Sequence, residues 1–169
     1  MSVKRTVTLA LLTAIALIIF VIEAQIPPIL PAVPGIKMGL ANIVSLFTLF
    51  WMGRKDAYLV LIVRILLGAI FAGTGVTLLY SLAGGLLSLS VIAIFRRAFS
   101  INALWIPSAL GGVLHNLGQL ACAAWLMHTW AVLAYLPVLI FAGTLSGLFT
   151  GIAAGQVVRH PAFKQDFQD

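Results

Sequence analysis

The side chains best suited to chemistry in this sequence lie where solvation is poorest. Arg64 stands in the middle of one apolar stretch, and His115, Asn116 and Gln119 stand in the middle of another. An arginine at the centre of a membrane helix costs at least about 2.5–3.5 kcal/mol, and such charges usually serve a ligand, an ion or a buried partner. These residues therefore indicate a polar site inside an apolar protein.

The residue types indicate that this site binds an anionic or strongly polar molecule. We expect Arg64 to contact such a group because no acidic residue lies at its depth, and Glu23 lies too far out to be its partner. Lys37 would add to this positive charge, although it could instead reach the outer head groups or pair with Glu23. A structural alternative is also open, in which Arg64 is anchored by backbone carbonyls and amides and His115 is a hydrogen-bonded core residue. The predicted ligand-binding residues are Lys37, Asn42, Arg64, Tyr80, His115, Asn116 and Gln119.

The sequence lacks the usual groups for catalysis. It contains no G-x-x-x-x-G-K-[ST] phosphate loop, no H-E-x-x-H motif and no C-x-x-C motif, so neither nucleotide hydrolysis nor a metal site is expected. The scattered acidic residues cannot form a carboxylate pair or an aspartate-rich site for magnesium and a diphosphate. The single cysteine, Cys122, is expected to pack as a small core residue. We therefore expect a protein that is not an enzyme and has no cofactor and no metal. The acidic residues are Glu23, Asp56, Asp166 and Asp169.

The composition places most of the chain in a membrane. Apolar residues make up 62% of the 169 residues and charged residues only 8%, whereas soluble domains are about half apolar. At about 20 residues per membrane helix, the chain has room for roughly six spans and little else. We expect an all-α membrane protein with a single domain, 1–169, made of six transmembrane helices in a compact bundle. The predicted helices are approximately 7–26, 36–52, 57–72, 76–95, 104–126 and 132–157.

Basic residues mark every second junction between the predicted helices. The other connections, 27–35, 73–75 and about 128–131, contain no lysine or arginine. Cytoplasmic loops are enriched in these residues, so the alternation predicts that both termini face the cytoplasm of a bacterial cell. The net charge of +6 then reflects membrane topology and not nucleic-acid binding. The basic junctions hold Lys4 and Arg5, Arg54 and Lys55, Arg96 and Arg97, and Arg159 and Lys164.

The polar residues gather between the predicted membrane midplane and the outer surface. A helix rises 1.5 Å per residue, so Arg64 lies roughly 12 Å in from the cytoplasmic side. His115 lies at a comparable depth, and Gln119 stacks one turn further out on the same face. This distribution favours a ligand pocket that opens outward over a pore that crosses the membrane. The proline-rich connection 27–35 is either a turn between two helices or a lid over this pocket.

Small residues at intervals of four predict close helix packing. Gly143, Gly147, Gly151 and Gly155 form a ridge without side chains on the last predicted helix. Such a ridge lets a neighbouring backbone approach closely, either within the bundle or across a dimer seam. Ala10 and Ala14 have the same spacing on the first predicted helix.

Three motifs follow one another along the chain: PGIKMGLANI at 34–43, LYSLAGG at 79–85 and HNLGQ at 115–119. In this order they resemble a bacterial membrane family labelled "Gx transporter" or "heptaprenyl diphosphate synthase component I", and the resemblance covers nearly the whole chain. That family is similar in size and six-helix plan to the S components of energy-coupling factor (ECF) transporters. S components bind a vitamin-like solute in an outward pocket and dock on a transmembrane protein that carries two ATPases. Small residues on their first helix form the docking face, so the resemblance implies this role for Ala10 and Ala14.

The leading hypothesis is a substrate-binding membrane protein of the S-component type, which binds a small acidic or amphiphilic molecule for uptake with a separate energising partner. The alternative is a non-catalytic membrane subunit in isoprenoid or quinone metabolism, which works with a soluble prenyltransferase. A third hypothesis is a structural subunit of a membrane redox or transport assembly, with Arg64 as a helix anchor. The expected partners are the lipid bilayer, a small molecule, and either an ECF transmembrane and ATPase module or a prenyltransferase subunit, without nucleic acid.

Overall fold

The structure is a computed structural model that describes residues 2–26, 37–72 and 74–163. Every long element in these ranges is an α-helix, and they contain no β-strand, which confirms the prediction of an all-helical protein. Short 3-10 turns at 96–98, 101–103, 131–135 and 161–163 connect or follow the later helices. The helices are α1 (Val3–Ala24), α2 (Asn42–Trp51), α3 (Arg54–Ala72), α4 (Gly75–Phe95), α5 (Trp105–Leu126) and α6 (Leu136–Arg159).

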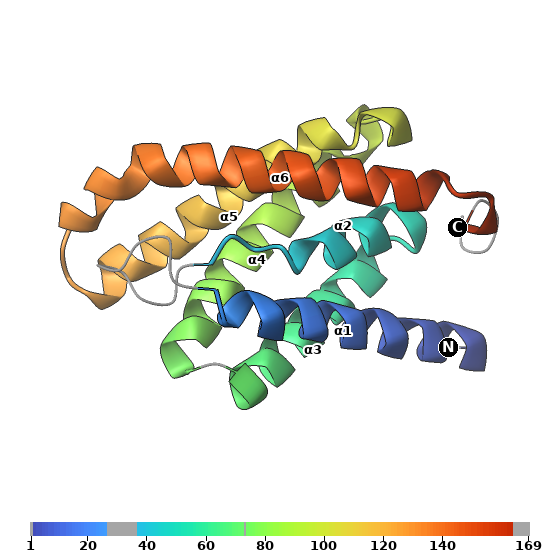
Figure 1. Cartoon of the computed structure of the whole chain (residues 1–169), viewed down its shortest axis with the longest axis horizontal. Coiled ribbons are helices and arrows are strands. Elements are labelled where there is room, and N and C mark those ends of the chain that lie inside the picture. The colour runs from blue at the N-terminus through green and yellow to red at the C-terminus, as the bar shows by residue number, and fades with distance from the viewer. Residues whose placement is uncertain (1, 27–36, 73, 164–169) are drawn as a thin grey trace.

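The helices form a bundle in which α2 is central. Helix α5 packs most extensively against α6 and α4, and α1 packs against α3. Helix α2 lies between α1 and α6 in Figure 1 and contacts both of them as well as α3. The start of α1 and the end of α6 lie at the same end of the bundle. This agrees with termini on one side of a membrane, while the identity of that side remains a prediction.

Local sequence signals fix several helix starts. The Ser2 side chain accepts a hydrogen bond from the backbone N–H of Arg5 and so caps α1. Thr74 and Thr77 form a reciprocal capping box at the start of α4. These side chains satisfy backbone N–H groups that have no partner within the first turn of a helix.

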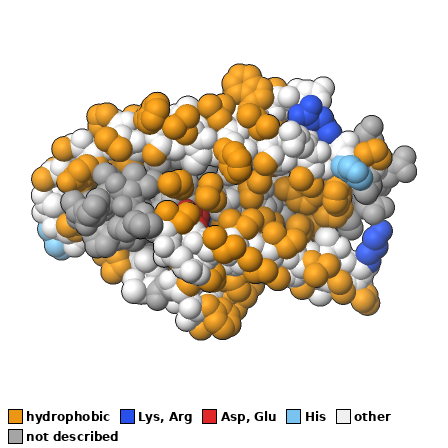
Figure 2. All heavy atoms as spheres, in the orientation of Figure 1, with side chains coloured by type: hydrophobic (Ala, Val, Ile, Leu, Met, Phe, Trp, Pro, Cys, Tyr) orange, Lys and Arg blue, Asp and Glu red, His pale blue; other side chains and the backbone are white. Residues whose placement is uncertain are grey.

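Three helical segments are long and apolar enough to cross a membrane: Val3–Ala24, Gly75–Ala98 and Ala131–Arg159. Helices α3 and α5 have 19 and 22 residues, which correspond to about 28 and 33 Å. Both helices contain polar side chains, including Arg64 and His115, that the bundle buries. Figure 2 shows hydrophobic side chains over most of one face, with Lys and Arg side chains at the end where the termini lie. This surface suits a protein surrounded by lipid.

Helix α2 differs from the predicted helix 36–52. It begins at Asn42 and has only 10 residues, or about 15 Å. Residues 37–39 have no regular secondary structure, and Gly39 has a φ of 78°, in the left-handed region that glycine adopts without strain. A helix cannot pass through this conformation, so the segment 37–39 enters the bundle as extended chain before α2 starts. The proline-rich connection 27–35 lies outside the described residues.

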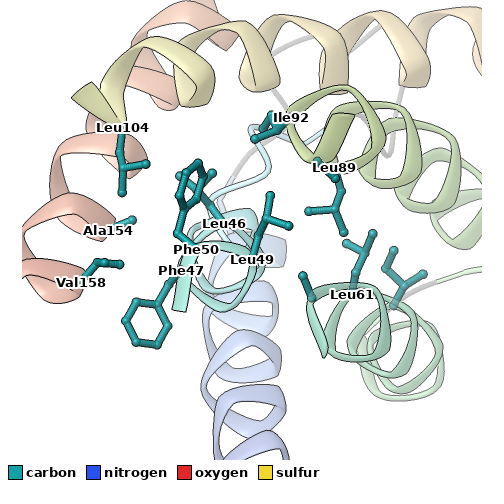
Figure 3. Close-up of a cluster of buried hydrophobic side chains, with 13 residues drawn as sticks. Leu46, Phe47, Leu49, Phe50, Leu61, Leu89, Ile92, Leu104, Ala154 and Val158 are labelled. Atoms are coloured by element: carbon teal, nitrogen blue, oxygen red, sulfur yellow. The ribbon is translucent and has the colours of Figure 1, made fainter. Parts of the chain in front are cut away.

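The largest apolar cluster is built around α2 and includes side chains of this helix and of its neighbours. Phe47, Leu49 and Phe50 of this helix are buried among side chains of its neighbours, as Figure 3 shows. Every residue from 44 to 50 is buried, as expected for a helix that is enclosed by others. The neighbouring side chains are Leu61 of α3, Leu89 and Ile92 of α4, Leu104 before α5, and Ala154 and Val158 of α6.

The glycine ridge of α6 packs against α5 within the chain. A Cβ added at Gly143 would lie 2.7 Å from the carbonyl oxygen of Gly112, and one at Gly151 would lie 2.7 Å from the Cα of Trp105. The two backbones are therefore in direct contact, which only residues without side chains allow. The sequence left open whether the ridge packs within the bundle or across a dimer seam, and in this structure it packs within the bundle.

Candidate functional site

The extended segment 37–39 is held by side chains from three helices. The carboxamide of Gln119 (α5) accepts the backbone N–H of Lys37 at 3.0 Å and donates to its carbonyl at 3.3 Å. The hydroxyl of Ser146 (α6) donates to the carbonyl of Met38 at 3.3 Å. The carboxylate of Glu23 (α1) accepts the backbone N–H of Gly39 at 2.6 Å. These bonds replace the backbone partners that a helix would supply, because buried peptide groups must be satisfied.

Arg64 begins a chain of hydrogen bonds across the bundle. Its guanidinium Nη2 donates to the side-chain oxygen of Asn42 at 3.0 Å, and the Asn42 nitrogen lies 3.1 Å from Nδ1 of His115. Arginine has no acceptor, so Asn42 must present its oxygen to Arg64 and its NH₂ group to His115. His115 Nδ1 therefore accepts, and the ring proton is assigned to Nε2. That nitrogen lies against the NH₂ group of Gln119, and because both groups are donors the hydrogen bonds that begin at Arg64 end at His115.

The other two predicted site residues, Asn116 and Tyr80, take part neither in these hydrogen bonds nor in those to the segment 37–39. Asn116 donates to the carbonyl of Leu139 at 2.8 Å, between α5 and α6, and its buried side-chain oxygen has no partner among the described residues. Tyr80 is buried in a second apolar cluster with Leu120 and Ala123. The role of these two residues in ligand binding stays a prediction.

Two positively charged side chains converge near the aromatic ring of Phe20 in α1. The Lys37 ammonium lies 3.7 Å from the ring centroid and the Arg64 guanidinium carbon lies 5.9 Å from it. Phe20 is itself fixed against α3, where a Cβ at Gly68 would lie 2.7 Å from its ring. Positive charges placed near an aromatic face are stabilised by its quadrupole.

The carboxylate of Glu23 is buried beside the segment that carries Lys37. Its side chain is only 5% exposed, and it acts electrostatically on both Lys37 and Arg64. The sequence places Glu23 too far out to be the obvious partner of Arg64, and in the structure the Arg64 guanidinium donates to Asn42 while Glu23 accepts from Gly39. Among the described residues the group holds two cations and one carboxylate, and thus carries a net positive charge of one.

Both cations have hydrogen-bond donors without a partner among the described residues. The Lys37 ammonium nitrogen is buried and has no hydrogen-bond partner among the described residues, and the same holds for Nε of Arg64. A lysine ammonium has three donors and an arginine guanidinium has five. This group, defined by Glu23, Lys37 and Arg64 and called the charged cluster below, can therefore accept further negative charge.

A small cavity is lined in part by Asn42. Its volume is about 30 Å³, whereas sites for small organic ligands usually enclose about 300–1,000 Å³. Glycines and hydroxyl side chains line much of it. The outward-opening ligand pocket expected from the sequence is a different feature and stays a prediction.

The two alanines expected on a docking face lie on the outside of the bundle. Ala10 and Ala14 of α1 are both exposed, next to the exposed apolar side chains of Val7, Leu11 and Ile18. The bundle therefore leaves this face free for lipid or for a partner.

Sequence reasoning missed three contributors to this site. Ser146 and Phe20 carry no sequence signal, since a serine and a phenylalanine are ordinary in apolar helices. Gly39 gave a usable signal, because it interrupts a predicted helix inside the first of the three motifs.

Comparisons with known proteins add a family assignment to this geometry. No curated protein and no solved structure matches the sequence. The family model described as "Heptaprenyl diphosphate synthase component I" matches residues 12–157, a range that contains the charged cluster and the hydrogen bonds from Arg64 to His115. The match confirms the resemblance found in the three motifs, and the chain belongs to the heptaprenyl diphosphate synthase component I family.

Proposed function

We propose that this protein is a non-catalytic membrane component of heptaprenyl diphosphate synthesis, which binds the diphosphate end of a prenyl diphosphate at the charged cluster. The observation that supports this most directly is the pair of buried cations, Lys37 and Arg64, beside a single carboxylate. The family name supplies the substrate class. This was the alternative hypothesis from the sequence, and the family match favours it over uptake.

The chemistry of the cluster suits a diphosphate. A diphosphate carries several negative charges and many acceptor oxygens, which match the unused donors of an arginine and a lysine. Glu23 offsets part of the positive charge when no ligand is bound, and its carboxylate is fixed by the N–H of Gly39. The prenyl tail needs no polar partner and would lie against the apolar helix surfaces or in the bilayer.

In this proposal, a prenyltransferase subunit carries out the catalysis. Prenyl transfer with an aspartate-rich magnesium site needs clustered carboxylates, and of the four acidic residues of this chain only Asp166 and Asp169 are close in sequence. Asp56 is already bound by Arg5, whose guanidinium lies 2.8 Å from the carboxylate. The protein would hold or present the amphiphilic molecule while a prenyltransferase subunit performs the reaction.

The test is binding of farnesyl diphosphate to the full chain in lipid nanodiscs, with farnesol as the uncharged comparison. We expect the diphosphate to bind and Lys37→Met to weaken binding at least tenfold. Lys55→Met, which changes an exposed lysine at the start of α3, is the matched control and should bind normally. Equal binding of the diphosphate and the alcohol, or unchanged binding by Lys37→Met, would exclude the charged cluster as the head-group site.

A second candidate is the uptake function of an S-component-like protein. The exposed position of Ala10 and Ala14 on α1 favours it, because small residues allow close approach of a partner helix. Purification from native membranes distinguishes the two functions. A prenyltransferase subunit that co-purifies supports the first proposal, whereas a transmembrane protein with two ATPases supports uptake.

A further inference from the structure

A hydroxyl-lined cavity lies between α2, α4, α5 and α6. Each of these helices contributes at least one hydroxyl to it: Ser45, Ser88, Ser108 and Thr150. Asn42 lines the same space, and its side chain also bonds Arg64. The cavity is therefore a polar interior space that adjoins the hydrogen bonds that link Arg64, Asn42 and His115.

The hydroxyls around the cavity differ in whether they have partners. Ser108 and Thr150 bond each other at 2.9 Å, and Thr150 also donates to the carbonyl of Gly147. Ser45 is 2% exposed, and its buried hydroxyl oxygen has no hydrogen-bond partner among the described residues. A buried hydroxyl without any partner costs about 1–3 kcal/mol. Ser45 therefore requires a partner that protein atoms do not supply.

We infer that the cavity holds about two ordered water molecules, which bind the hydroxyl of Ser45 and join α2 to α4, α5 and α6. The volume of about 30 Å³ is sufficient, since a water needs roughly 10–15 Å³ in this measure and two to four polar partners. The inference rests on the cavity alone and is independent of the proposed function.

The lining chemistry favours water over an ion. None of the residues that line the cavity is charged, so a cation would lack a carboxylate ligand, and the nearby Arg64 would repel it. An anion would find few free donors, because Thr150 and Ser146 already donate to backbone carbonyls. A water molecule can accept a hydrogen bond from Ser45 and can donate to hydroxyl or carbonyl oxygens, so it suits both the donors and the acceptors around the cavity.

Radiolytic hydroxyl-radical footprinting of the full-length protein in nanodiscs tests this inference. Ordered buried water generates radicals in place, so an apolar side chain beside it is oxidised although bulk solvent does not reach it. Leu61 lines the cavity, whereas Leu49 does not, and both are 0% exposed. We expect mass spectrometry to show Leu61 oxidised at least threefold faster than Leu49. Equal background rates at the two leucines would show a dry cavity and overturn the inference.

The melting temperature of Ser45→Ala provides a second readout. If water binds the hydroxyl, the substitution removes a hydrogen bond and lowers the melting temperature. If the hydroxyl has no partner, its removal raises the melting temperature. Ser81→Ala, at a buried serine of α4 away from the cavity, is the control. Stabilisation by sodium over choline that disappears in Ser45→Ala would assign the cavity to a cation and overturn the inference as well.

Discussion

Gln119 pairs with the backbone of Lys37 as a neighbouring strand would, accepting its N–H and donating to its carbonyl. The two residues are 82 positions apart, and no regular secondary structure joins them. This pairing explains how extended chain can lie inside an apolar bundle, because the side chain supplies the bonds that a helix would otherwise form.

Gln119→Met should destabilise the protein by about 2–4 kcal/mol, since methionine keeps the volume but leaves both backbone groups of Lys37 without partners. Thermal unfolding in detergent, followed by circular dichroism, measures the change. Gln156→Met alters an exposed glutamine of α6 and should have little effect. Equal melting temperatures for the two variants would contradict the role assigned to Gln119.

Gly39→Ala should be strongly destabilising for two reasons. The φ of 78° is unfavourable for alanine, and the added Cβ would lie 2.7 Å from the ring of His115. Gly75→Ala is the matched control, because no heavy atom lies within 4 Å of its added Cβ. We expect a large fall in melting temperature for the first variant and a small change for the second. A similar change in both would mean that Gly39 is not held in this conformation.

Arg64→Leu should reduce the affinity for farnesyl diphosphate at least tenfold while the protein still folds and inserts. It should also lower stability by about 1–3 kcal/mol, because the buried oxygen of Asn42 loses its donor. Arg64→Lys keeps the charge and should retain more of the affinity, without the planar donor geometry of arginine. Calorimetric titration in nanodiscs measures binding. Lower stability with unchanged affinity would favour the structural alternative, in which Arg64 only anchors the helices.

Glu23→Gln should increase the affinity for farnesyl diphosphate. The substitution removes the only negative charge of the charged cluster, while its amide oxygen can still accept the N–H of Gly39. Two cations would then face the ligand without a competing carboxylate. The increase should fall as salt is added, because ionic strength screens the interaction. A decrease in affinity at all salt concentrations would indicate that Glu23 is needed to position the ligand.

The sequence allowed the helical fold and much of the site to be predicted. Hydropathy located the helices because each must cover its backbone with apolar side chains. The burial of Arg64, His115 and Gln119 followed from their central positions in apolar stretches. The groups that contact these three side chains could not be predicted. They depend on the path of residues 37–39, and only the folded bundle determines that path.

The grouping of Glu23 with Lys37 and Arg64 could not be predicted for a related reason. A depth counted at 1.5 Å per residue locates backbone atoms, but Lys37 and Arg64 have long side chains that extend far from their Cα atoms. Both reach the ring of Phe20, less than one turn before Glu23 in α1. The charged cluster therefore forms between side-chain ends, while the backbone positions of its members differ in depth.

The short helix α2 has a consequence for how the chain is made. Its ten residues cover about 15 Å of a hydrocarbon core about 30 Å thick, and the preceding extended segment depends on Gln119 and Ser146. The ribosome synthesises these two residues long after residues 37–39. The segment before α2 therefore cannot form its final contacts until helices α5 and α6 have been made.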